Sequence, residues 1–142
     1  MDIRPLTPDL AVAPQITPDQ VPALAEAGFR MLINNRPDSE VGPELSSAAM
    51  EQAALAAGMA YVYNPFEPGQ VTPEMITIQA EAIRKHPAFA YCRSGNRSTV
   101  LWALSQAGVQ PIETLLATAD KAGYDLTPIL PLLQSLAGRN EG

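Results

Sequence analysis

The only cysteine of this 142-residue chain stands in a setting suited to nucleophilic chemistry. Cys92 follows a short apolar segment, and two arginines, Arg93 and Arg97, come first and fifth after it. A thiol at the start of a helix faces free backbone N–H groups and a partial positive charge, to which the guanidinium groups add. Each of these favours the thiolate, and together they can cradle an anion. The spacing therefore predicts a nucleophilic cysteine that acts on a small anionic substrate.

Other residues of the same loop suit the binding of that anion. Arg97 can hold an oxyanion through two parallel N–H bonds, which a lysine could not match, so we expect it to act with Cys92 in catalysis. Gly95 has no Cβ and lets the backbone turn sharply with its amides facing inward. The anion is expected to be bound by Arg93, Ser94, Gly95, Asn96 and Ser98.

Composition limits the partners of the chain. A net charge of −6 argues against nucleic acid or an anionic membrane surface as a partner. One cysteine and one histidine, His86, leave too few ligands for a usual metal site, and neither a metal nor a cofactor is expected. No run approaches about 18 apolar residues and the N-terminus does not resemble a signal peptide, so we expect a cytoplasmic protein.

The elements expected to position the cysteine alternate between helices and short apolar strands. Helices are expected over residues 17–27, 44–57, 72–85 and 98–107, after Pro111 and over residues 126–136. Strands are expected over residues 29–34, 59–63 and 87–91. This alternation predicts one α/β domain over residues 1–142, with a mostly parallel central sheet covered by helices on both faces. In such sheets ligands bind beyond the carboxyl ends of the strands, where Cys92 and the segments 34–36 and 64–67 all fall.

The loop from Cys92 to Ser98 resembles the active-site loop of rhodanese-type sulfurtransferases and a shortened cysteine-phosphatase loop. Together with segments 33–40, 101–104 and 122–126, it resembles the bacterial family of beta-lactamase-hydrolase-like proteins, phosphatase-like domain, over about residues 3 to 136. The resemblance implies a three-layer fold similar to that of dual-specificity phosphatases. It also implies one of two activities, since members have been described as phosphatases and as sulfurtransferases linked to sulfide oxidation.

Loop length favours the sulfurtransferase reaction. Cysteine phosphatases place five residues between the cysteine and the arginine, whereas this chain places four, and Ser98 stands where the phosphatase arginine belongs. We therefore expect a rhodanese-like enzyme in which Cys92 takes a sulfur atom from thiosulfate or a small persulfide. Because the chain has no second cysteine, an external thiol would have to accept that sulfur from the Cys92 persulfide.

Two alternatives stay open. A phosphatase would form a phosphocysteine at Cys92 from a phosphate ester and needs a general acid, for which Glu67 is the only carboxylate on the segment after the second expected strand. Arg36 could reach the anion from the end of the first expected strand, or form an ion pair with Asp38 or Glu40. The second alternative is a module that binds anions without catalysis.

Overall fold

The computed structural model describes residues 1–85 and 87–141, with side chains up to residue 138, so His86 lies outside the described residues. The described strands are β1 (Arg4–Thr7), β2 (Leu10–Ala13), β3 (Met31–Asn34), β4 (Ala60–Tyr63) and β5 (Ala88–Tyr91). The described α-helices are α1 (Val21–Glu26), α2 (Ser47–Ala56), α3 (Pro73–Ile83), α4 (Asn96–Ser105), α5 (Ile112–Lys121) and α6 (Leu130–Glu141). Within these ranges no helix has the length and apolar character needed to cross a bilayer.

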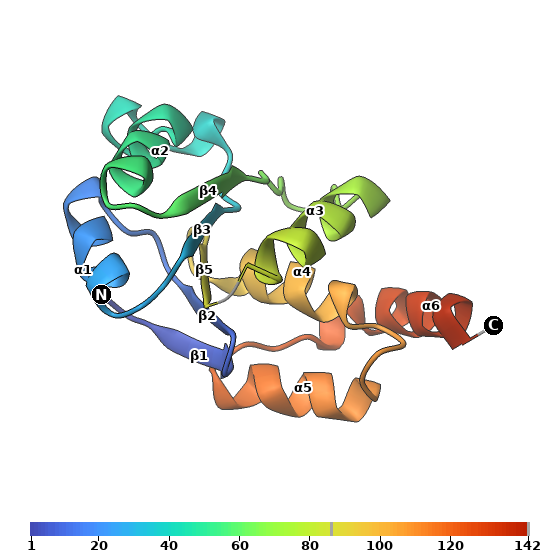
Figure 1. Ribbon diagram of the computed structural model, residues 1–142. Helices are drawn as coiled ribbons and strands as arrows, with labels where there is room; N and C mark the ends of the chain where they lie inside the picture. The colour runs from blue at the N-terminus through green and yellow to red at the C-terminus, as the bar shows by residue number, and fades with distance from the viewer. Residues whose placement is uncertain (86, 142) are drawn as a thin grey trace.

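The strands form a single sheet in the order β1-β2-β5-β3-β4, seen in Figure 1. β5 pairs in parallel with β2 on one side and with β3 on the other, and β3 pairs in parallel with β4. Only β1 runs antiparallel to its neighbour, β2. The mostly parallel sheet predicted from the sequence is thus confirmed, and the strand that precedes Cys92 lies at its centre.

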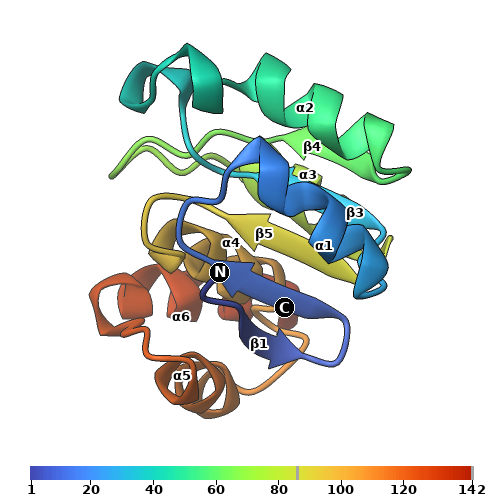
Figure 2. The same ribbon diagram turned by 90° about the vertical axis from the view of Figure 1, so that its left-hand side faces the viewer.

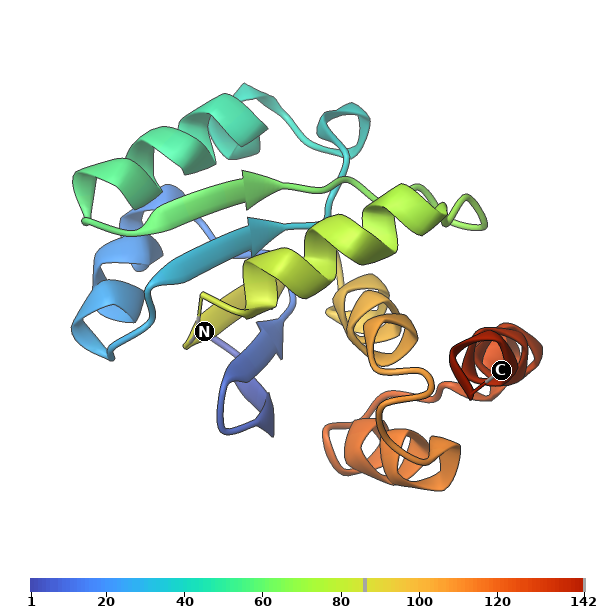
Figure 3. The same cartoon turned by 45° about the vertical axis from the view of Figure 1, so that its right-hand side comes forward.

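Helices cover both faces of the sheet, and side chains alternate between the two faces along each strand. Val12, Ile33 and Ala90 pack in one apolar core with residues of α3, α4, α5 and α6. Leu32 and Phe89 belong to a second core, which includes residues of α1 and α2. Figures 2 and 3 show α1 and α2 on the side of the sheet opposite α3 and α4. This arrangement confirms the expected three-layer α/β fold.

Two local features differ from the sequence-based prediction. The hairpin of β1 and β2 was not expected, because its strands have four residues each and β1 contains a proline, so neither shows a clear alternating pattern. The helix after the cysteine begins at Asn96 rather than Ser98, because Gly95 serves as its N-cap. The earlier start brings Asn96 and Arg97 into the first turn of α4, directly after the cysteine loop.

Three buried amide side chains join the ends of β3 and β4 to α3. Gln79 on α3 donates to the Asn35 side-chain oxygen (3.0 Å) and accepts from the side-chain amides of Asn35 (2.9 Å) and Asn64 (3.0 Å). Asn35 also donates to the Asn64 carbonyl (2.9 Å). Buried amides that satisfy one another fix a specific geometry, because any shift leaves a polar group unpaired. The segments that follow β3 and β4 are therefore held in a defined position beside β5.

Candidate active site

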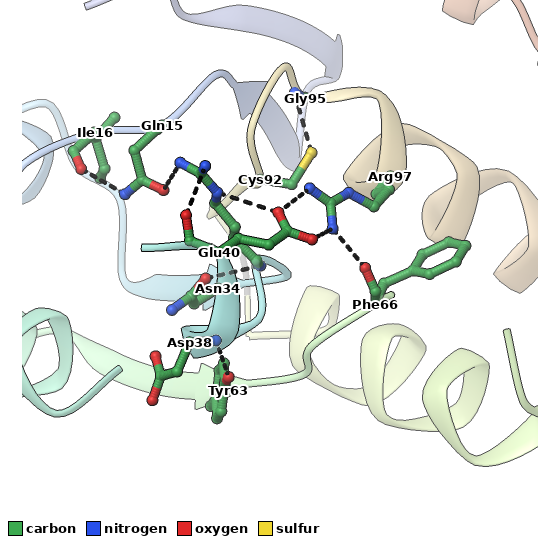
Figure 4. A network of polar contacts seen from close by, with 11 residues as sticks. Gln15, Ile16, Asn34, Asp38, Glu40, Tyr63, Phe66, Cys92, Gly95 and Arg97 are labelled. Carbon is green, nitrogen blue, oxygen red and sulfur yellow. Dashed lines mark hydrogen bonds and ion pairs between the residues drawn. The ribbon is translucent and has the colours of Figure 1, made fainter. Parts of the chain in front are cut away.

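Cys92 lies at the carboxyl end of β5 and is fully buried. The backbone N–H of Gly95 donates to its Sγ at 3.1 Å, as Figure 4 shows. Gly95 adopts a φ of 92°, a conformation that favours glycine, and α4 begins at the next residue. The sulfur is thus placed against the N-terminal end of a ten-residue helix, where backbone N–H groups lack partners within the helix.

The loop turns its carbonyl oxygens away from the sulfur. The carbonyls of Arg93 and Ser94 accept hydrogen bonds from residues outside the loop, and the Gly95 carbonyl accepts from the first turn of α4. Their donors are the Gln15 N–H (3.3 Å), the Tyr124 hydroxyl (2.9 Å), and the Thr99 N–H (3.1 Å) and hydroxyl (2.8 Å). In a trans peptide the N–H points opposite to the C=O, so the N–H groups that follow these carbonyls are directed to the other side of the loop. This is the arrangement that binds an oxyanion.

Replacing Gly95 with alanine is expected to displace the loop and lower the free energy of unfolding by about 2 kcal/mol or more. A Cβ at this position would overlap the Tyr124 hydroxyl and would have to be accommodated at a positive φ. Chemical denaturation measures the loss. Gly58→Ala is the matched control, because Gly58 also has a positive φ (81°) but has no atom within 4 Å of an added Cβ. Equal losses in the two variants would contradict the tight contact between Tyr124 and the loop.

Arg97 is held by a carboxylate that the sequence did not single out. Its two Nη atoms donate to the two carboxylate oxygens of Glu40 (2.8 and 2.7 Å), and one of them also donates to the Phe66 carbonyl (2.7 Å). The Arg97 side chain is only 13% exposed. Glu40 is the main cause of a raised pKa of Arg97, with a further contribution from the sulfur of Cys92. The guanidinium is therefore fixed next to the sulfur.

Arg36 also binds Glu40, the partner of Arg97 in this ion pair. It donates to a carboxylate oxygen (3.3 Å) and to the carbonyl (3.2 Å) of Glu40, and to the Gln15 side chain (3.1 Å). Of the two possible partners of Arg36, the structure shows Glu40. Asp38 instead accepts the N–H of Ser47 at the start of α2 (2.7 Å). Hydrogen bonds from Arg97, and then from Arg36, lower the pKa of Glu40.

A hollow of about 400 Å³ opens beside the cysteine loop. Its lining includes Arg93, Ser94, Asn96 and Arg97, together with Phe66 and other residues of the segment after β4. Ser98 is buried in the first turn of α4, and its hydroxyl has no partner among the described residues. Of the residues expected at the site, Arg93, Ser94, Asn96 and Arg97 thus line the hollow, whereas Cys92 and Ser98 are buried beside it.

Glu67 is not among the residues that line this hollow. It is exposed and lines a different hollow with Tyr63, Pro65 and Thr72. In the described part of the chain no carboxylate lines the hollow beside the cysteine loop. Arg36 likewise contacts Glu40 rather than the loop itself. Neither Glu67 nor Arg36 therefore lines the hollow beside the cysteine loop.

Sequence reasoning missed Glu40 as the partner of Arg97, and Tyr124 as the donor to the loop. The one available signal for Glu40 was its position four residues after Arg36, which suggested an ion pair but not a link to Arg97. Tyr124 lies 30 residues from Ser94, its partner, and no local pattern indicates that contact.

Comparison with known proteins agrees with this geometry. The family model for the phosphatase-like domain of beta-lactamase hydrolase-like proteins matches residues 2–109. A beta-lactamase hydrolase-like protein of Xylella fastidiosa is 31% identical over 130 residues, which are 89% of this chain and 30% of that protein. This chain thus spans less than a third of the length of that relative.

Solved structures share this fold. A candidate phosphatase of Neisseria meningitidis superposes with a TM-score of 0.82 at 26% identity, over 96% of this chain and 99% of the other. PTPMT1 superposes with a TM-score of 0.73 at 13% identity, over 98% of this chain and 96% of the other, and shows the likeness of fold alone. The predicted likeness to cysteine phosphatases is confirmed.

The expectation of a sulfurtransferase is wrong. The candidate phosphatase of Neisseria meningitidis favours the phosphatase alternative, and it gives no support to a thiosulfate donor, a persulfide or an external thiol acceptor. The error came from counting residues between Cys92 and Arg97. In the folded loop Arg97 lies in the first turn of α4, near enough to Cys92 for the sulfur to contribute to the raised pKa of Arg97, so a loop one residue shorter still places the arginine beside the nucleophile.

Proposed function

Because the chain belongs to the family of phosphatase-like domains of beta-lactamase hydrolase-like proteins, we propose that it hydrolyses phosphate monoesters through a phosphocysteine at Cys92. One observation carries the proposal: three successive loop carbonyls are turned outward around a buried sulfur, with Arg97 fixed beside it. A phosphoryl group offers three equatorial oxygens, which suit a ring of N–H groups and one guanidinium.

The proposed reaction has two displacements. First, the Cys92 sulfur attacks phosphorus, so that an S–P bond forms while the P–O bond to the leaving group breaks. Water then attacks the phosphocysteine, the S–P bond breaks, and inorganic phosphate leaves with the sulfur again free. The loop N–H groups and Arg97 stabilise the charge on the phosphoryl oxygens in both steps.

The leaving oxygen needs a proton in the first step unless it is already a stable anion. No carboxylate lines the hollow within the described residues, and Glu67 faces the neighbouring hollow. We therefore propose that water supplies this proton. Under this proposal aryl phosphates, which release stable phenolates, are cleaved much faster than alkyl phosphates.

The phosphocysteine can be tested directly. The protein is mixed with p-nitrophenyl phosphate, quenched in acid within the first turnovers and digested. We expect nitrophenol release and a mass gain of about 80 Da on the peptide that contains Cys92. Binding of the ester without release of nitrophenol would refute the proposal and leave an anion-binding module.

Glu40→Gln is expected to lower kcat/KM for aryl phosphates by about tenfold, because Arg97 loses the carboxylate that fixes its orientation. Glu40 acts here as a positioning residue, since it contacts Arg97 and not the substrate. The control is Glu81→Gln, which removes an exposed carboxylate on α3. Unchanged kinetics in Glu40→Gln would show that Arg97 keeps its orientation without Glu40.

The pH dependence of the unfolding free energy tests whether Glu40 is paired with Arg97 as the structure shows. The pKa of Glu40 lies below its ordinary value of 4.5, chiefly because of Arg97, so the ion pair stabilises the fold above that pH. This contribution is lost as the pH falls through the lowered pKa. The difference in unfolding free energy between wild type and Glu40→Gln should therefore be full at neutral pH and should close on acidification.

A further inference from the structure

The guanidinium of Arg93, which lines the hollow, has no partner among the described side chains. Arg97 and Arg36 are both engaged with Glu40. The side chain of Arg93 is exposed, and within residues 1–85 and 87–138 it has no hydrogen bond or ion pair. Arg93 directly follows the cysteine and lines the hollow, so its guanidinium is available to a molecule bound there.

The lining of the hollow is also partly apolar. Phe66, Val100 and Ile129 line it together with the polar residues of the cysteine loop. A phosphate held by Arg97 and the cysteine loop would leave the rest of the substrate in the hollow that these apolar side chains line together with Arg93. The hollow therefore suits a leaving group with an apolar body and an anionic end.

The charge of the whole protein favours a small molecule over a large anionic partner. The chain carries 15 acidic against 9 basic residues, which repels an anionic membrane or an acidic polymer at a distance. A small solute meets only the local field of the loop, where Arg93 adds an unpaired positive charge. A guanidinium binds a carboxylate or a phosphate through two parallel hydrogen bonds.

We infer that the substrate is a small phosphate monoester whose apolar leaving group carries a second anionic group, a carboxylate or a phosphate, which Arg93 binds. This inference rests on the proposed phosphatase function and specifies the substrate class for the same site.

The test compares two esters of similar size, 4-carboxyphenyl phosphate and 4-carbamoylphenyl phosphate. The amide is the better leaving group, so a preference for the carboxylate cannot arise from leaving-group chemistry. We expect wild type to show a kcat/KM about fivefold higher for the carboxylate at low salt, and this ratio to shrink as ionic strength rises. A third ester, 1,4-phenylene bisphosphate, shows whether a second phosphate gives a larger gain than the carboxylate.

Arg93→Gln should reduce the ratio of the two kcat/KM values to that set by the leaving groups. Arg84→Gln is the matched control, because it removes an exposed positive charge at the C-cap of α3 and should keep the preference. The same ratio of kcat/KM values in wild type and in Arg93→Gln would overturn the inference while leaving the phosphatase proposal intact. If the protein cleaves none of the three esters, the phosphatase proposal itself is refuted.

Discussion

Replacing Cys92 with serine is expected to lower kcat for aryl phosphates by at least about 10⁴-fold. The hydroxyl is a far weaker nucleophile than a thiolate at neutral pH, and no neighbouring base in the hollow is placed to activate it. Within the described residues, the side chains that line the hollow are apolar, amide, hydroxyl or guanidinium groups. Initial rates with p-nitrophenyl phosphate measure the effect.

The same variant provides its own control for folding and binding. Serine is close to cysteine in size, and the Gly95 N–H can donate to its oxygen in place of sulfur. Inorganic phosphate should therefore raise the melting temperature of Cys92→Ser as it does that of wild type. Residual turnover above about one per cent of wild type would show that another group performs the attack.

Replacing Arg97 with lysine should lower kcat/KM for aryl phosphates by about 10³-fold. Both carboxylate oxygens of Glu40 hold the planar guanidinium in one orientation, and the nearby sulfur of Cys92 contributes to its raised pKa. An ammonium group keeps the charge but cannot make parallel bonds to Glu40 and also bind the phosphoryl oxygens in a fixed geometry. The loss should appear in kcat as well as KM, because the arginine is proposed to act most strongly in the transition state.

A matched replacement tests whether the effect comes from the position. Arg30→Lys makes the same change at an exposed arginine just before β3, at the end of the sheet opposite the cysteine. Its kinetics should equal those of wild type. If Arg97→Lys were also equal to wild type, the charge alone would suffice and the proposed role of the fork-shaped contact would be refuted.

The sequence predicted elements well where local chemistry determines them. Thr17 and Gln20 form the capping box that begins the first helical turn, and Thr72 accepts the N–H of Met75 at the start of α3. The apolar run before Cys92 became β5, as expected for a strand buried on both faces. These features depend on residues close together in the chain, so a pattern in the sequence is enough to indicate them.

Contacts between distant residues could not be predicted in the same way. Glu40 lies 57 residues from Arg97, and Gln79 lies 44 residues from Asn35. The partner of such a residue depends on how the layers pack, which no local pattern encodes. The same limit explains the wrong choice of reaction, because the number of residues between Cys92 and Arg97 does not reveal where the guanidinium lies in space.

The hydrogen bond from Tyr124 to the Ser94 carbonyl has a consequence for anyone who designs fragments or chimaeras of this protein. The segment that the family model matches spans residues 2–109 and includes Cys92 and Arg97, but it ends before Tyr124. A graft of residues 2–109 alone would transfer Cys92 and Arg97 but not Tyr124, whose hydroxyl holds the loop between them by its hydrogen bond to the Ser94 carbonyl. The smallest transplantable unit must therefore extend past α5.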